Sequence, residues 1–141
     1  MSMAQKTLRS VRVIHAALLL AALLYVWLPT MIVHTSGKEV PIAMVLAVSI
    51  VALSSLGIAV FFRRRMVQPA ADRLSKNPED AQAAGRWRSS VVVSLAFCES
   101  VVLFGLILWF IGAGWNVYGV FYAIGIFFLL AWYPRMDLLP Q

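Results

Sequence analysis

Long apolar stretches alternate with short polar ones along this chain. Each apolar stretch has about 20 residues, the length that an α-helix needs to cross the roughly 30 Å hydrocarbon core of a bilayer. The pattern predicts four membrane-spanning helices, over residues 11–33, 41–62, 91–112 and 115–133, with a polar loop at 63–90. We therefore expect an all-α membrane protein in which residues 1–141 form a single four-span domain.

The composition agrees with this pattern and narrows the function classes. Hydrophobic residues make up 62% of the chain and charged residues 13%, against about 45–50% and about 25% in soluble domains. A length of 141 residues leaves no room for a soluble catalytic domain beside the spans. With one cysteine, Cys98, neither an intrachain disulfide nor a cysteine-based metal site can form. No nucleophile–base pair, ligand cluster or glycine-rich phosphate loop is present. We expect neither an enzyme nor a resident metal or cofactor.

The basic residues predict the topology. Eleven of the 12 Lys and Arg residues lie before or at the very start of the first span, within 63–90 or after the fourth span, and only Lys38 falls on the other side. Cytoplasmic loops carry such an excess of basic residues. Both termini and the 63–90 loop are therefore expected to be cytoplasmic, most simply in a bacterial inner membrane. The net charge of +6 is then a topology signal, and no nucleic-acid partner is expected.

Aromatic residues near the predicted span ends fit an interfacial belt. They are Trp27, Trp87, Trp109, Trp115, Trp132 and Tyr133.

The 63–90 loop has a local pattern of its own. It predicts a short helix, a turn at Asn77-Pro78 and a new helix whose first turn holds Glu79 and Asp80, where acids face the positive end of the helix dipole. That helix could continue through 81–84 into the third span. The basic residues in this region suit a lipid-headgroup anchor or, alternatively, a site for a partner or an anionic lipid. The candidates are Arg63, Arg64, Arg65, Arg86 and Arg88.

Glu99 is the residue that the membrane tolerates least. It lies near the middle of the third span, where an ionised acid costs about 2.5–3.5 kcal/mol on insertion scales. Burial disfavours the charged form, so we expect a neutral carboxyl unless a cation meets it. Three roles follow: binding a proton or an ion, hydrogen-bonding a neighbouring helix, or a contact inside a larger complex.

Small residues predict where the helices pack. Ser94, Cys98 and Gly105 share one narrow stripe of the third span, about a third of a turn away from Glu99. Gly119 and Ala123 form a second small pair on the fourth span. Small residues let helix backbones approach closely. We expect helix packing at these five positions and a Glu99 side chain directed elsewhere, toward another subunit.

Residues 76–108 resemble the loop and second helix of the rotary ATP synthase proteolipid, subunit c, and the looser likeness covers residues 43–111. Proteolipid loops carry an Arg-Gln-Pro or Arg-Asn-Pro element followed by Glu, for which Lys76-Asn77-Pro78-Glu79 stands here. Their proton-carrying acid lies in an Ala-Phe-x-Glu setting, matched by Ala96-Phe97-Cys98-Glu99 and the following 103–107 string Leu-Phe-Gly-Leu-Ile.

Two functions follow. If the resemblance holds, it implies that Glu99 binds and releases a proton against a partner's arginine in a homo-oligomer, while residues 76–79 face a soluble stalk. Otherwise the chain is expected to be a non-catalytic accessory subunit of a larger respiratory or photosynthetic membrane complex, bound to lipids and other integral subunits. His15 offers one further option, a single haem or pigment ligand.

Overall fold

In the computed structural model, residues 2–32 and 40–135 are described, and these residues form helices and turns but no strand. The elements are α1 (Met3–Met31), α2 (Ile42–Phe62), the π-helix η1 (Arg63–Val67), α3 (Gln68–Lys76), α4 (Ala81–Phe110) and α5 (Trp115–Ala131). The predicted all-α class is confirmed for this part of the chain. Three helices are long and apolar enough to cross a membrane, namely α1, the 35-residue unit Ile42–Lys76, and α4.

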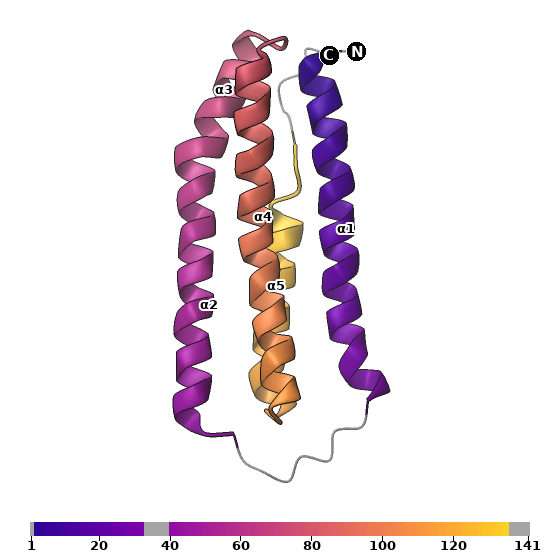
Figure 1. Cartoon of the computed structure of the whole chain (residues 1–141), viewed down its shortest axis with the longest axis vertical. Helices are drawn as coiled ribbons and strands as arrows, with labels where there is room; N and C mark the ends of the chain where they lie inside the picture. Colours follow the sequence, from indigo (N-terminus) through magenta and orange to yellow (C-terminus); the bar gives the residue numbers. More distant parts are fainter. Residues whose placement is uncertain (1, 33–39, 136–141) are drawn as a thin grey trace.

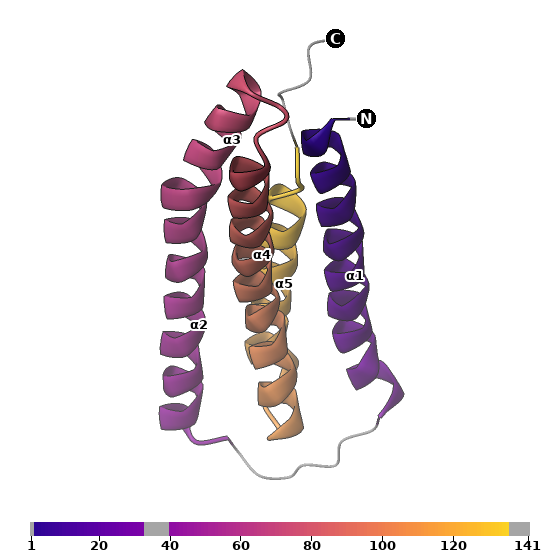
Figure 2. The same ribbon diagram turned by 45° about the horizontal axis from the view of Figure 1, so that its top comes forward.

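α4 is the central helix of the bundle. It lies between α2 and α1, with α5 behind it in the view of Figure 1, and Figure 2 shows the same order. α4 packs extensively against all three of these helices, whereas α1 and α2 share no extensive contact. The arrangement is therefore open: three helices surround three sides of α4, and the fourth side is left between α1 and α2.

α1 begins earlier than the apolar pattern predicted. Its first residue is Met3, and Ser2 caps it in a reciprocal capping box with Gln5. The sequence pattern placed the start at 11 because Lys6 and Arg9 interrupt the apolar run. Ala4 and Leu8 are nevertheless buried, so this first part of α1 is amphipathic. Near the other end, Pro29 lies inside the helix, and the last turns bend outward in Figure 1, as a proline that removes a backbone donor is expected to cause.

Most of the 63–90 region is helical, in the predicted order of helix, turn and helix. α2 matches its expected range, but the chain continues as helix through η1 and α3 as far as Lys76. The expected turn is present: the amide of Asp80 donates to the carbonyl of Asn77 over 3.1 Å. α4 then starts at Ala81, where the Asp80 side chain accepts a hydrogen bond from the amide of Ala83 over 2.9 Å. Charged residues ended the apolar run in sequence without ending the helix.

The connection between α4 and α5 is as short as predicted. Gly112 adopts a positive φ of 96°, a conformation that side chains disfavour, and α5 turns back antiparallel to α4. α5 has 17 residues, about 26 Å of helix at 1.5 Å per residue. It ends at Ala131, short of the predicted 133, and is the shortest of the four apolar helices.

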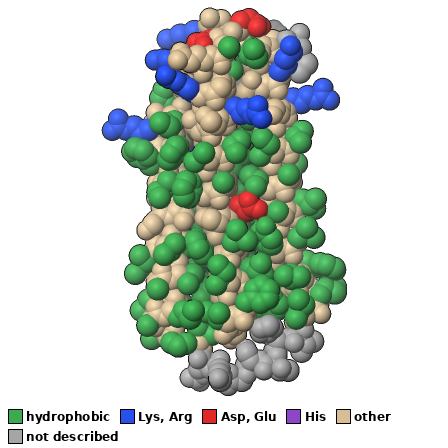
Figure 3. Space-filling model, viewed as in Figure 1, with side chains coloured by type: hydrophobic (Ala, Val, Ile, Leu, Met, Phe, Trp, Pro, Cys, Tyr) green, Lys and Arg blue, Asp and Glu red, His purple; other side chains and the backbone are tan. Residues whose placement is uncertain are grey.

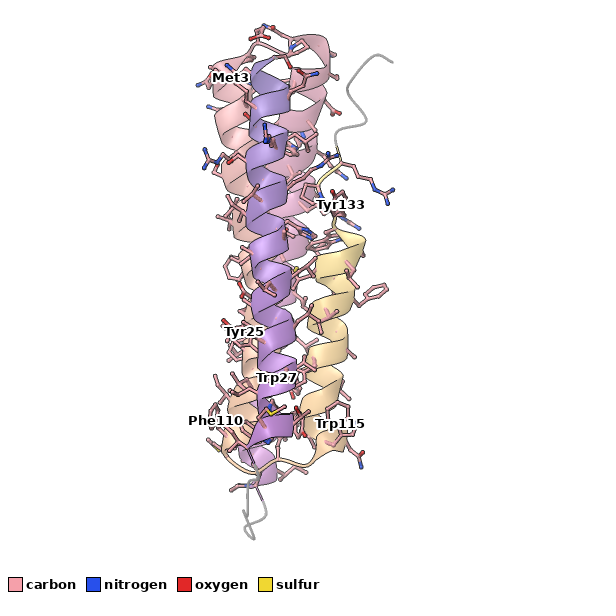
Figure 4. The ribbon with its side chains drawn as sticks, turned by 90° about the vertical axis from the view of Figure 1, so that its right-hand side faces the viewer. Met3, Tyr25, Trp27, Phe110, Trp115 and Tyr133 are labelled. Atoms are coloured by element: carbon pink, nitrogen blue, oxygen red, sulfur yellow. The ribbon has the colours of Figure 1, made fainter. Side chains whose placement is uncertain are left out.

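The two ends of the bundle differ in chemistry. Lys and Arg gather at the end that carries α3, and the rest of the face in Figure 3 is largely apolar. The start of α1 lies at this basic end, because the amide of Ala4 donates to the carbonyl of Pro78 over 3.1 Å. Trp27 and Trp115 lie at the opposite end in Figure 4, both more than half exposed. Lys38, which the topology argument placed at that opposite end, lies outside the described residues.

Two tryptophans do not belong to an interfacial belt. Trp87 is 2% exposed and Trp109 5% exposed, so both are packed inside the bundle. The belt assignment is corrected for these two residues. Position along the helix suggested an interface, but it did not reveal which side of α4 each ring occupies.

Candidate functional site

Small residues of α4 lie at some of its closest contacts with α2 and α5. The Ser94 hydroxyl donates to the carbonyl of Ala59 on α2 over 3.1 Å. On the side of α5, a Cβ added at Gly105 would lie 2.8 Å from the Tyr122 ring. Cys98 is fully buried, and its carbonyl oxygen would lie 3.2 Å from a Cβ at Gly125 of α5. Ser94, Cys98 and Gly105 therefore lie where the helices approach most closely.

The second small pair, Gly119 and Ala123, does not make this contact. Ala123 is exposed, and a Cβ at Gly119 would meet only Trp115 of its own helix. Gly125 makes the close approach to α4 instead, since an added Cβ there would collide with the Val102 side chain. Within this chain, α5 therefore approaches α4 closely at its own Gly125 and at Gly105 of α4, and not through Gly119 and Ala123 as expected.

Glu99 lies on the side of α4 that no other helix covers. Ala96, Leu103 and Ile107 share this side at spacings of seven and four residues and are exposed. Glu99 and Ser100 lie between them and are partly exposed. We call Ala96, Glu99, Ser100, Leu103 and Ile107 the open face. Figure 3 shows one acidic side chain midway along an apolar surface, and Glu99 is the one acid within the described helices α1, α2, α4 and α5.

The Glu99 carboxyl has no partner among the residues that the structure describes. Every hydrogen bond of the open face is local: the Ser100 hydroxyl donates to the carbonyl of Phe97 over 2.7 Å. Neither a hydrogen bond nor an ion pair from the described residues reaches Glu99. Ionising a carboxyl in an apolar surface costs free energy, which favours the protonated form. Because no described residue bonds to it, the carboxyl can hydrogen-bond to a group from outside the chain.

The turn of residues 76–79 is partly occupied by α1. The Glu79 carboxylate accepts a hydrogen bond from the amide of Met3 over 3.4 Å, and the Asn77 side chain accepts one from the amide of Glu79 over 3.3 Å. Lys76, Asn77 and Glu79 are exposed, while Pro78 is half-buried. The side chains of the turn are accessible, but the start of α1 hydrogen-bonds to Pro78 and Glu79 on one side of it.

The five candidate arginines divide into separate environments. The Arg63 guanidinium lies 5.0 Å from the centre of the Trp132 ring, a cation–π distance. Arg65 and Arg86 line a groove between η1–α3 and α4. Arg64 and Arg88 are exposed and do not line that groove.

His15 is a buried structural residue. It is 1% exposed, and its Nε2 lies 2.8 Å from the carbonyl oxygen of Leu129. Because a carbonyl only accepts, Nε2 carries the hydrogen and donates. Tyr133 packs edge-on against the imidazole with ring centres 5.3 Å apart. This corrects the option of a haem or pigment ligand, since Nε2 is already bonded and the ring is covered.

The sequence contained a signal for this burial. His15 continues the spacing of Ala4, Leu8 and Val11, which are buried on the same side of α1. The sequence argument also missed Arg73, which lines the groove with Arg65 and Arg86. Its position in α3 could not be related to α4 without knowing how the two helices pack.

No group of three or more His, Cys, Asp or Glu side chains that could hold a metal ion occurs within residues 2–32 and 40–135. Comparison of the chain with protein-family models, curated proteins and solved structures finds no match. The resemblance to the ATP synthase proteolipids stays a prediction.

Proposed function

We propose that this protein is a non-catalytic subunit of a larger membrane complex, and that it binds a transmembrane helix of another subunit through the open face of α4. The observation that carries the proposal is the position of Glu99: its carboxyl has no partner within residues 2–32 and 40–135, and it lies on a side of α4 that the other described helices leave uncovered. The protein spans the membrane four times, with α5 as the shortest span.

The same proposal places both termini and the 76–79 turn in the cytoplasm, most simply at a bacterial inner membrane. It is supported by the basic residues at the α3 end of the bundle (Figure 3) and by the preference of cytoplasmic segments for Lys and Arg.

The energetics favour a helix as the occupant of the open face. A protonated carboxyl can both donate and accept a hydrogen bond, and a hydrogen bond between membrane helices contributes about 0.6–2 kcal/mol. Ala96 and Ser100 flank Glu99 with small side chains, which lets a second backbone approach. Lipid chains would leave the carboxyl without a hydrogen-bonding partner.

Photocrosslinking in native membranes tests this proposal. We expect a photoreactive phenylalanine at Leu103, on the open face, to give a specific adduct with another membrane protein. The matched control carries the same residue at Val120, which is 52% exposed on α5, and should give lipid adducts only. Equal protein crosslinking from both positions, or none from Leu103, would reject the open face as the docking surface.

A second candidate is proton carriage by Glu99, as the resemblance implies. It is favoured by the same unpaired and partly exposed carboxyl, which a partner's arginine could reach. A hydrophobic carbodiimide should then label Glu99, less so at high pH, and the label should disappear in Glu99→Gln but persist in Glu79→Gln. Protonated Glu99 in a docking role could also be labelled, so a functional readout is needed as well.

Proton flux separates the two candidates. Glu99→Gln removes the titrating group and keeps an amide that can hydrogen-bond. Proton carriage predicts a homo-oligomer whose proton flux is lost in Glu99→Gln. The docking role predicts that the complex and its activity survive this substitution.

A further inference from the structure

A hollow lined by charged residues lies at the basic end of the bundle, away from the open face. It is a groove of about 610 Å³ between η1–α3 and α4. Three elements each contribute one arginine to it: Arg65 from η1, Arg73 from α3 and Arg86 from α4. The remaining lining residues are Met66, Pro69, Ala70, Ala83, Ser89 and Ser90.

Two of these arginines lie on the continuous helix that runs through the π-helix η1 into α3. A π-helix has i→i+5 hydrogen bonds and occurs mostly as single turns, frequently at functional sites. Its wider turn changes the direction of the side chains that follow relative to a continuous α-helix. Here Arg65, Pro69 and Arg73, at four-residue intervals across η1 and α3, all line the groove.

The three guanidinium groups have no acidic partner within the described part of the chain. The described acids nearest to them in sequence are Asp72, Glu79 and Asp80. Asp72 is exposed and forms no ion pair with a described residue, Asp80 caps α4, and Glu79 accepts from the amide of Met3. No ion pair joins any described carboxylate to Arg65, Arg73 or Arg86. Three convergent positive charges without a counter-charge favour binding of an anion.

The rest of the groove indicates which anion. Ala70 and Ala83 are buried beneath it and give it an apolar base. The hydroxyls of Ser89 and Ser90 donate to the carbonyl of Arg86 over 3.1 Å and 2.6 Å, so the guanidinium groups are the donors left for a ligand. A volume of about 610 Å³ is within the range of about 300–1,000 Å³ for organic ligands, larger than inorganic phosphate needs.

We infer that this groove binds the phosphodiester headgroup of an anionic phospholipid, with Arg65, Arg73 and Arg86 around the phosphate. A surface at this end of the bundle lies at headgroup depth if α2 and α4 span the bilayer. The lipid's glycerol and first acyl carbons would cover Ala70 and Ala83. This site is independent of the proposed docking role of α4.

Two matched triple variants test the assignment. The first is Arg65→Gln, Arg73→Gln and Arg86→Gln, which removes the groove arginines. The control is Arg64→Gln, Lys76→Gln and Arg88→Gln, which removes the same charge from the same three elements outside the groove. Both variants lose the general attraction of basic residues for anionic lipid equally, so any difference between them measures the groove.

The measurement is binding of phosphatidylglycerol, and of phosphatidylcholine for comparison, to the full-length protein in neutral detergent micelles by native mass spectrometry. The wild type and the control triple should retain one phosphatidylglycerol in preference to phosphatidylcholine. The groove triple should bind it at least about tenfold more weakly, as expected when charge-assisted hydrogen bonds are lost. Equal weakening in the two triples, or no preference for the anionic lipid, would overturn the site.

Two further arms complete the test. Inorganic phosphate and glycerol 3-phosphate should fail to displace the lipid at equal concentration, and displacement by either would assign the groove to a soluble phosphate instead.

If the groove triple does not fold, as judged by its elution volume and helix content, the single variants Arg73→Gln and Lys76→Gln replace the two triples. The same ordering of affinities is then expected, and its absence would reject the lipid site.

Discussion

At the scale of single residues, side-chain size and polarity decide how this bundle packs. Gly105 and Gly125 lie where α4 and α5 approach most closely, because an added Cβ at either position would meet a neighbouring side chain within 3 Å. Gly119, on the same helix as Gly125, makes no such contact. The sequence predicted that small residues would mark the contact, and it identified Gly105. It could not select Gly125 over Gly119, because both are glycines in an apolar helix.

The packing at Gly125 gives a prediction about stability. We expect Gly125→Ala to lower the free energy of unfolding in detergent by about 1–3 kcal/mol, because the new methyl group overpacks the contact with Val102. Gly57→Ala in α2 is the control, since a Cβ there has nothing within 4 Å, and alanine favours helix. Unfolding by denaturing detergent, followed by helix content, measures both. A Gly125→Ala protein as stable as Gly57→Ala would contradict the observed contact.

At the scale of elements, the apolar pattern predicted the helices well and their ends poorly. The spans of α2 and α4 and the turn after Asn77 follow from apolar length and from proline and acid positions. α1 begins earlier than predicted because Lys6 and Arg9 interrupt the apolar pattern while the backbone stays helical. The helix expected after the Asn77-Pro78 turn does continue into the third span as α4. The open face could not be predicted at all, since α4 is apolar on its packed sides and on its uncovered side alike.

The end of α5 depends on one residue of α1. The last carbonyls of a helix lack intrahelical donors, and the Nε2 hydrogen of His15 satisfies that of Leu129. We expect His15→Leu to lower the free energy of unfolding by about 1–3 kcal/mol, the cost of an unsatisfied buried carbonyl, and to speed hydrogen exchange in the last turn of α5. Val13→Leu, at a position that is 66% exposed, should change neither quantity. Unchanged exchange in His15→Leu would show that the cap is dispensable.

At the scale of the whole molecule, the bundle is open on one side and basic at one end. α4 is covered on three sides by α1, α2 and α5 (Figures 1 and 2). Its remaining side carries Glu99, which no other described residue pairs with. Such a shape fits a subunit whose helix packing is completed by another protein. The proposed roles both depend on what meets the open face and the basic groove.

The central claim is that a partner helix covers the open face at Glu99, and native mass spectrometry of the gently solubilised protein tests it most directly. We expect the wild type and Glu99→Gln to carry the same unrelated subunit, because both side chains can hydrogen-bond across helices. Glu99→Leu should lose that subunit, while Ser54→Leu, which removes an exposed hydroxyl from α2, should keep it. A homo-oligomer without any other polypeptide, or a partner that Glu99→Leu does not release, would contradict the account.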